Sequence, residues 1–251
     1  GLHFTGIDYA FPVGITLAAG ERIVVVKNQA AFSAAYETAG INIAPGEFSS
    51  TSLDNSGEQL ALIDATGTDA QRFTYNDKAP WPTSPDGDGF SLVLIAPDSS
   101  PDHSLATSWR SSVGLDGSPG GSDAVTFSGD PDLDADGDGL SAFLEYALGS
   151  TGGDTESSPE SYLEVGTTSL DDGGGDTEHY LTLSYRRNLA ADDVLYEVQC
   201  ANDLEAWSSL GTVLMSAIPN GDGTETVTHR STAPLASIAR EFIRLRVTSR
   251  R

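Results

Sequence analysis

The sequence predicts a mostly β protein, built of two β-sandwich domains joined by a short connector that carries an acidic loop and a helix. Two observations support this fold class. Short runs rich in β-branched residues recur between turn residues, which include 27 glycines and 12 prolines, at the spacing of a sandwich. Between two such regions, closely spaced aspartates run into an apolar segment of helical period. We therefore expect a first domain at residues 1–123, a connector at 124–154 and a second domain at 155–251.

The first region alternates strand and turn signals. Asn28 can cap a short helix over residues 29–36, which ends before Gly40. The turn at 64–67 reads as a hairpin connection. By alternation or β-branched content, strands are expected at 7–11, 21–26, 59–63, 71–75 and 90–95.

Several segments of this region resemble one known family. In order along the chain they are "FPVGITLAAGERIVVVKNQAAFSAAY", "LDNSGEQLALIDATG", "YNDKAPWPTSPDGDGFSLVLI", "WRSS" and "GSPGGSD". Together they are similar to the bacterial lamin-tail domain, which implies an immunoglobulin-like β-sandwich with no catalytic residues to carry over. The family normally opens with one or two further strands, so we expect Gly1 to lie near the end of a part that is missing here. A sheet that lacks those strands would have an open edge.

The connector contains the most specific motif of the chain, D-A-D-G-D-G-L-S-A-F-L-E from Asp134 to Glu145. The twelve-residue calcium loop takes oxygen ligands at positions one, three and five, a backbone carbonyl at seven and a bidentate glutamate at twelve. Those positions hold Asp134, Asp136, Asp138, Leu140 and Glu145, with glycine at the sharp turn of position six. Position nine is an alanine, so a water would take that place. Ca²⁺ is the expected ligand.

The alternative is an acidic linker that stays solvated. Against it stand the glycine at position six, the glutamate at position twelve, and the helical spacing of apolar residues up to Gly149, a C-cap signal. Residues 125–131 cannot form the entering helix of a full EF-hand, because Gly129 and Pro131 would break it. The loop is therefore closer to the single-helix loops of dockerin-type and thrombospondin-type repeats, which favours a structural ion over a sensor.

The second region follows a polar linker at residues 154–160 and has the pattern of another small β-sandwich. "LEYALG" at 144–149 and the spacing from Tyr196 to Trp207 resemble C-terminal β-domains of large exported bacterial proteins, which implies an outer or secreted setting. The turn 220–223 is a strong hairpin signal, and Trp207 is expected to fill a core. Strands are expected at 162–165, 180–185, 194–199, 224–229 and 241–247.

Composition excludes some functions. The formal net charge is −24 and lysine occurs only at Lys27 and Lys78, so binding to nucleic acid or to an anionic membrane is not expected. No apolar run is long enough to span a bilayer, and the single cysteine, Cys200, excludes a disulfide framework. No nucleophile elbow or phosphate-binding loop occurs, and the four histidines lack metal-ligand spacing.

We therefore expect a non-catalytic, exported accessory or adhesion region, extracellular or at the cell surface, in which a structural Ca²⁺ fixes two β-domains. Its partner would be a protein or a cell-surface glycan. The alternative is a carbohydrate- or surface-binding module of a larger secreted enzyme, with Trp81 or Trp207 stacking on a sugar. Trp81 and the acidic run 86–88 form a candidate platform, although a tryptophan between two prolines more often packs. A hydrolase would need a carboxylate pair that sequence cannot reveal.

Overall fold

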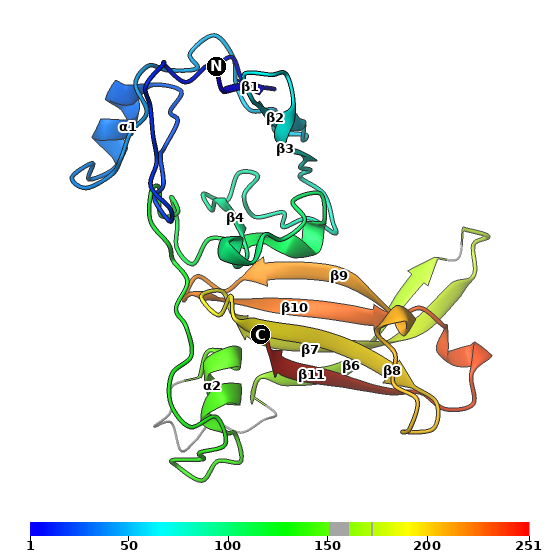
Figure 1. Cartoon of the computed structure of the whole chain (residues 1–251). Coiled ribbons are helices and arrows are strands. Elements are labelled where there is room, and N and C mark those ends of the chain that lie inside the picture. Colours follow the sequence, from blue (N-terminus) through cyan, green and yellow to red (C-terminus); the bar gives the residue numbers. More distant parts are fainter. Residues whose placement is uncertain (151–160, 172, 251) are drawn as a thin grey trace. The chain divides into compact units, whose positions relative to one another are not determined.

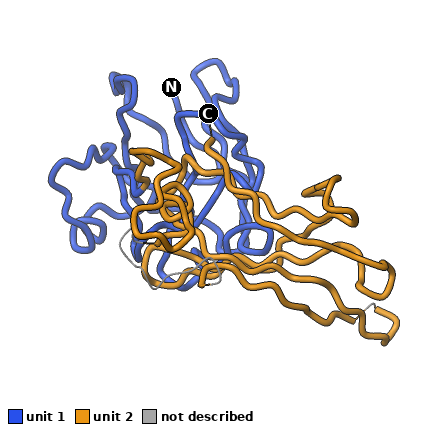
Figure 2. The backbone as a smooth tube through the Cα atoms, turned by 90° about the horizontal axis from the view of Figure 1, so that it is seen from below, with its two compact units in different colours: residues 1–123 blue, residues 124–251 orange. Residues whose placement is uncertain are grey.

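The computed structural model describes residues 1–150, 161–171 and 173–250, and the chain divides into two compact units, residues 1–123 and 124–251 (Figure 2). Small antiparallel sheets build both units, so the protein is mostly β, as the sequence predicts. The expected polar linker, residues 154–160, lies outside the described residues.

The first unit is built of short elements separated by long turns (Figure 1). One sheet has the order β1–β2–β3, and β4 pairs with β5; all pairs are antiparallel. The bounds are β1 His3–Thr5, α1 Gln29–Ala35, β2 Gln59–Ile63, β3 Asp69–Thr74, β4 Leu92–Leu94, η1 Pro97–Ser99, η2 Ala106–Ser108 and β5 Trp109–Ser111. Helix α1 begins as expected, since the Asn28 side chain accepts a hydrogen bond from the Ala31 N–H at 2.7 Å.

Two expected strands of this unit were wrong. Residues 7–11 form a single bridge, between Ala10 and His3, and residues 21–26 form another, between Val24 and Ile43. The alternation of residues 7–11 reflects burial, because Ile7 and Tyr9 join Ala44 and Phe48 in a small core without a continuous ladder. The β-branched run 21–26 likewise contributes half-buried side chains, and its backbone bonds to only a few residues of 42–48.

The second unit has longer strands and two clusters of buried apolar residues. A four-stranded antiparallel sheet has the order β6–β7–β10–β9, and β11 pairs with β8. The bounds are α2 Ala142–Leu148, β6 Leu163–Asp171, β7 Thr177–Asn188, β8 Val194–Ala201, η4 Ser209–Gly211, β9 Thr212–Pro219, β10 Thr224–Ser231, η5 Leu235–Ser237 and β11 Phe242–Ser249. The expected hairpin turn 220–223 joins β9 to β10, whereas β9 itself was not expected from the sequence.

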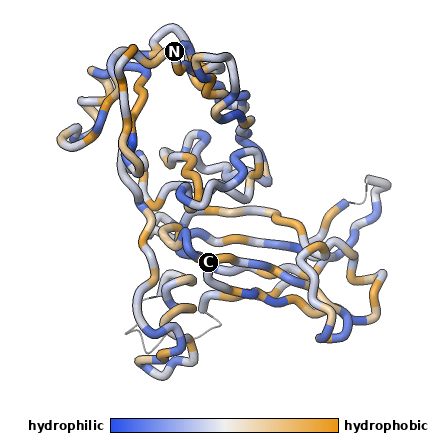
Figure 3. The backbone as a smooth tube through the Cα atoms, viewed as in Figure 1, coloured by the Kyte–Doolittle hydropathy of each residue, from blue (hydrophilic) through white to orange (hydrophobic). Residues whose placement is uncertain are grey.

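Both sheets of this unit contribute to the same core. Leu183, Tyr185, Val198 and Val227 are buried there, from β7, β8 and β10. Hydrophobic and hydrophilic residues alternate along these strands (Figure 3), as expected when one face of each strand is buried. The connector was expected at residues 124–154; its described residues, 124–150, belong to this unit, and α2 packs beside β7.

Within residues 1–150, 161–171 and 173–250, no helix has the length and apolar character needed to cross a membrane.

Candidate metal centre

Three of the expected calcium ligands lie together in the loop before α2. Asp134, Asp136 and Asp138 each offer one carboxylate oxygen, and these oxygens lie within 4.8 Å of one another. Like charges at such separations repel one another, and a cation shared between them would offset the repulsion. The cluster is therefore an arrangement that can hold a metal ion.

The loop backbone is folded around the first aspartate. The Asp134 carboxylate accepts hydrogen bonds from the Gly137 N–H at 2.8 Å and from the Gly139 N–H at 3.2 Å. Asp138 accepts from the Leu140 N–H at 2.7 Å. Gly139 has φ 93°, a backbone conformation that residues with a Cβ rarely adopt, which explains glycine at position six. Hydrogen bonds from backbone N–H groups of the loop thus hold the carboxylates of Asp134 and Asp138 in place.

Glu145 supplies a separate sign that a cation belongs here. It lies in the first turn of α2, is only 4% exposed, and its Oε1 atom is buried without a hydrogen-bond partner among the described residues. Oδ2 of Asp136 is buried and unpartnered in the same sense. Burial, followed by the charges of Asp136, Asp138 and Asp134, raises the pKa of the Glu145 carboxyl. A buried carboxylate without a donor is costly, and a cation would satisfy it.

The last expected ligand, Leu140, and the aspartate that precedes the motif, Asp132, are both close to the cluster in the chain. Leu140, at position seven, is 3% exposed, so its side chain anchors the loop while its backbone carbonyl is the expected ligand. Asp132, which lies just before the motif, is exposed and is not part of the aspartate cluster. Residues 124–132 contain no helix, in agreement with the sequence, which excludes a complete EF-hand.

The position of Glu145 is fixed by the caps of α2. At the start of the helix, the Ala142 N–H donates to the Leu133 carbonyl at 2.7 Å. At its end, Gly149 adopts φ 71° and the Ser150 N–H donates to the Glu145 carbonyl at 2.8 Å. A Cβ on Gly149 would lie 2.5 Å from Cγ2 of Thr224, so this C-cap tolerates only glycine.

The rest of α2 is held against the second unit. Ala147 is fully buried and packs with Ala191 and Val194, and its carbonyl accepts from the Tyr196 hydroxyl at 2.6 Å. The Asn188 side chain donates to the Tyr146 carbonyl at 2.9 Å. Because helix and sheet share a core, this packing sets the position of Glu145, which interacts electrostatically with the aspartates but is not part of their cluster.

The segment that precedes the loop is anchored to the same unit. The Val125 N–H donates to the Ala190 carbonyl at 2.8 Å, and the Phe127 N–H donates to the Asp193 carboxylate at 2.9 Å. The Tyr146 hydroxyl donates to the other oxygen of Asp193 at 2.5 Å. Asp193 was not predicted from the sequence, because no local motif marks it. The one related signal is Tyr146 in "LEYALG", whose hydroxyl needs a polar partner.

The tryptophans of the alternative hypothesis are not free platforms. Trp81 and Trp207 are both half-buried. The Arg244 guanidinium lies 4.0 Å from the ring centroid of Trp207, so it covers one face of that indole, and Trp81 packs on Trp109 with ring centroids 6.0 Å apart. Trp207 was expected to fill a core, and instead it carries this cation–π contact at the edge of one.

Comparisons of the chain with family models, with curated proteins and with solved structures find no match.

Proposed function

We propose that residues 134–145 bind one Ca²⁺ as a structural ion. The observation that carries the proposal is the buried Glu145 carboxyl, whose Oε1 atom has no hydrogen-bond partner among the described residues and which interacts electrostatically with the three clustered aspartates. Asp134, Asp136, Asp138 and Glu145 would supply carboxylate oxygens, Leu140 its backbone carbonyl, and a water the place beside Ala142. Stripped of metal, this arrangement concentrates negative charge at a buried site; with Ca²⁺ the charge is compensated.

The donor set favours calcium over other metals. Every ligand is an oxygen, as hard cations require, whereas zinc prefers nitrogen and sulfur. A bidentate carboxylate and a backbone carbonyl suit the high coordination number and flexible geometry of Ca²⁺. Mg²⁺ demands octahedral geometry and keeps several waters, so we expect it to bind more weakly.

A structural role fits better than a sensor role. A calcium sensor opens a pair of helices, whereas α2 follows the loop alone and its buried Ala147 packs in a core cluster of the second unit. The ion would fix the loop and α2 on that unit. We also propose that ordering this stretch restricts how the second unit follows the first. Small-angle scattering that is unchanged by removal of metal would contradict this part.

The wider proposal is a non-catalytic accessory or adhesion region of an exported protein. It is supported by the resemblance of residues 1–123 to lamin-tail domains, by the β-rich units and by the acidic charge. An immunoglobulin-like sandwich for each unit, an extracellular or cell-surface location and a protein or glycan partner belong to the same proposal. Calcium is abundant outside cells, where a site of modest affinity is filled.

Calorimetric titration of the metal-stripped protein tests the site directly. We expect one Ca²⁺ per chain, and weaker binding by about 100-fold or more for Glu145→Gln, which removes a charged bidentate ligand. Asp132→Asn is the matched control, since this neighbouring aspartate is exposed and outside the cluster. Equal affinities of wild type and Glu145→Gln, or no heat at all, would contradict the proposal.

A further inference from the structure

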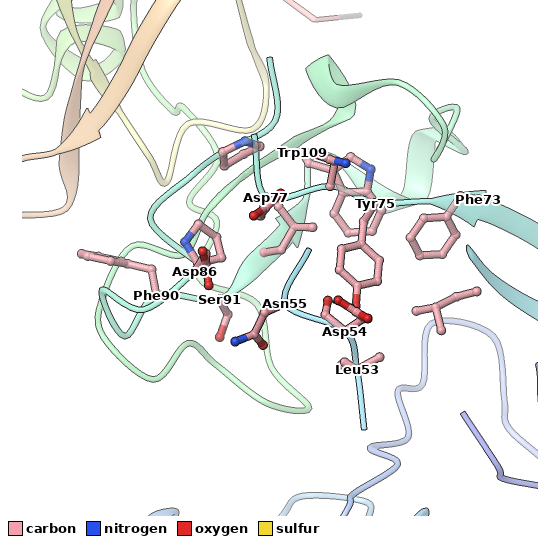
Figure 4. A pocket seen from close by; sticks show the side chains of 15 residues that line it. Leu53, Asp54, Asn55, Phe73, Tyr75, Asp77, Asp86, Phe90, Ser91 and Trp109 are labelled. Carbon is pink, nitrogen blue, oxygen red and sulfur yellow. The ribbon is translucent and has the colours of Figure 1, made fainter. Parts of the chain in front are cut away.

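A pocket of about 460 Å³ lies within the first unit and is independent of the metal centre. It is formed by residues around the turn 53–55, by the end of β3 and the residues after it, by the segment 82–92 and by Trp109 (Figure 4). Its volume lies in the range of small-molecule sites, about 300–1,000 Å³. The residues come from distant parts of the sequence, so only the fold brings them together.

One part of the lining is aromatic. Phe73, Tyr75, Phe90 and Trp109 all contribute side chains (Figure 4). The ring centroids of Phe73 and Trp109 lie 5.3 Å apart, and the Trp109 indole donates from Nε1 to the His103 carbonyl at 2.9 Å. The rings are therefore fixed in place before any ligand arrives, which lowers the entropic cost of binding.

The charged part of the lining has one sign. Asp54, Asp77 and Asp86 line the pocket, and no lysine or arginine is found among the described residues that do so. The Asp54 carboxylate accepts from the Ser56 hydroxyl and N–H at 2.6 and 2.8 Å, and these hydrogen bonds lower its pKa, so it stays ionised at neutral pH. The pocket thus concentrates negative charge beside aromatic rings.

Asp77 carries an unsatisfied acceptor at this site. Its Oδ1 atom is buried and has no hydrogen-bond partner among the described residues, although the residue as a whole is half-buried. An unpaired buried oxygen costs free energy that a ligand donor or cation recovers. A neutral ligand would not compensate the negative charge of the pocket. A cation would compensate that charge and would also interact favourably with Oδ1 of Asp77.

We propose that this pocket binds an organic ammonium group, seated against the Trp109 and Phe73 rings with its positive charge facing Asp77. Aromatic faces attract such cations through the ring quadrupole, and alkylated ammonium groups also gain from apolar contact. The sequence predicts a candidate binding platform at Trp81 and residues 86–88. Of these residues, Asp86 lines the pocket, and Trp81 packs against Trp109. The ligand class differs from the sugar first expected there.

The test compares choline with 3,3-dimethylbutan-1-ol, its uncharged isostere, by NMR titration of the whole chain at constant chloride. We expect saturable shifts of the Trp109 indole resonance with choline and affinity at least about tenfold lower for the isostere. Asp77→Asn and Asp86→Asn should each weaken choline binding severalfold. Asp98→Asn, an exposed change outside the pocket, is the control and should leave binding unchanged.

Three outcomes would overturn the proposal. Equal binding of choline and its isostere would make the site merely apolar, and binding of a methyl glycoside in place of choline would make it a sugar site. No binding of choline by a folded chain would exclude an ammonium site. If Asp77→Asn fails to fold, Asp86→Asn and the isostere still decide the question.

Discussion

The two units reach a folded state by different means. In the first, strands are only three to six residues long, and fewer of the described apolar side chains are buried. In the second, strands run for eight to twelve residues and carry more of the buried apolar side chains. We therefore expect the first unit to depend more on single polar contacts and the second unit to depend more on buried apolar residues.

The largest effect is expected at the buried ion pair of the first unit. The Arg110 guanidinium and the Asp123 carboxylate approach to 2.5 Å, with side chains 4% and 9% exposed, and Asp123 also accepts from the Val113 N–H. Asp123→Ala would remove the carboxylate that compensates the buried Arg110 charge, at a cost of about 3–5 kcal/mol. Urea unfolding, followed by tryptophan fluorescence in a Trp207→Phe background that leaves only first-unit tryptophans, measures it.

The control breaks an exposed pair of the same unit. Asp69→Ala removes the contact between Asp69 and Arg72, whose side chains are 42% and 41% exposed respectively, and should cost far less stability than the loss of the buried pair. Equal losses for both variants would mean that burial does not set the strength of ion pairs in this unit.

The next largest difference in stability loss between the two units is expected when a core side chain is truncated to alanine. Leu183→Ala in β7 truncates a side chain that is 2% exposed and is expected to cost about 3–4 kcal/mol, whereas Ile7→Ala truncates one that is 8% exposed and should cost about 2 kcal/mol. Hydrogen exchange of the amides of each unit reports the two losses separately. A larger loss for Ile7→Ala would reverse the comparison.

Acid should weaken the second unit through His229. Burial, and then the nearby Arg187 charge, lowers the pKa of this histidine to about 4. The unfolded chain binds the proton with an ordinary pKa of about 6.5, so stability falls as pH drops from about 6.5 toward 4, by on the order of 2–3 kcal/mol. His229→Leu should flatten that part of the wild-type pH profile of urea unfolding. Parallel profiles for the two proteins would contradict this assignment.

The smallest effect concerns the cap of α1. Asn28→Ala removes the bond to the Ala31 N–H and should cost about 1 kcal/mol. The loss should appear as faster hydrogen exchange in residues 29–36, with β6–β11 unchanged. Unchanged exchange in α1 would show that tertiary contacts, rather than the cap, hold this helix.

Features set by neighbouring residues, such as helix caps and turns, could be predicted from the sequence. Features set by tertiary contacts, such as strand pairing, could not. Asn28, Gly149 and the turn 220–223 each act within a few residues, and the structure shows the cap, the helix end and the hairpin they indicate. The run 21–26 has ideal strand composition, yet a ladder needs a partner of matching length, which the sequence does not display. β9 was not predicted for the converse reason. The composition of β9 is not typical of a strand, but β10 provides a strand with which it pairs.

The candidate site divides in the same way. The aspartate spacing is local and could be read directly, whereas the burial of Glu145 depends on α2 packing against Ala191 and Val194. The pocket at Asp77 and Trp109 joins distant segments and left no pattern in the sequence beyond Trp81 and its acidic neighbours.

A thermal melt of metal-stripped protein, with and without Ca²⁺, tests the central claim most directly when wild type and Glu145→Gln are compared. Calcium at a hundred times its dissociation constant should stabilise the wild type by about 2.7 kcal/mol and raise its midpoint, while the variant should hardly respond. Without calcium the variant should melt higher than the wild type, because it removes a buried charge that faces three aspartates. A wild type that calcium leaves unchanged, or a variant that responds equally, would contradict a structural calcium site at residues 134–145.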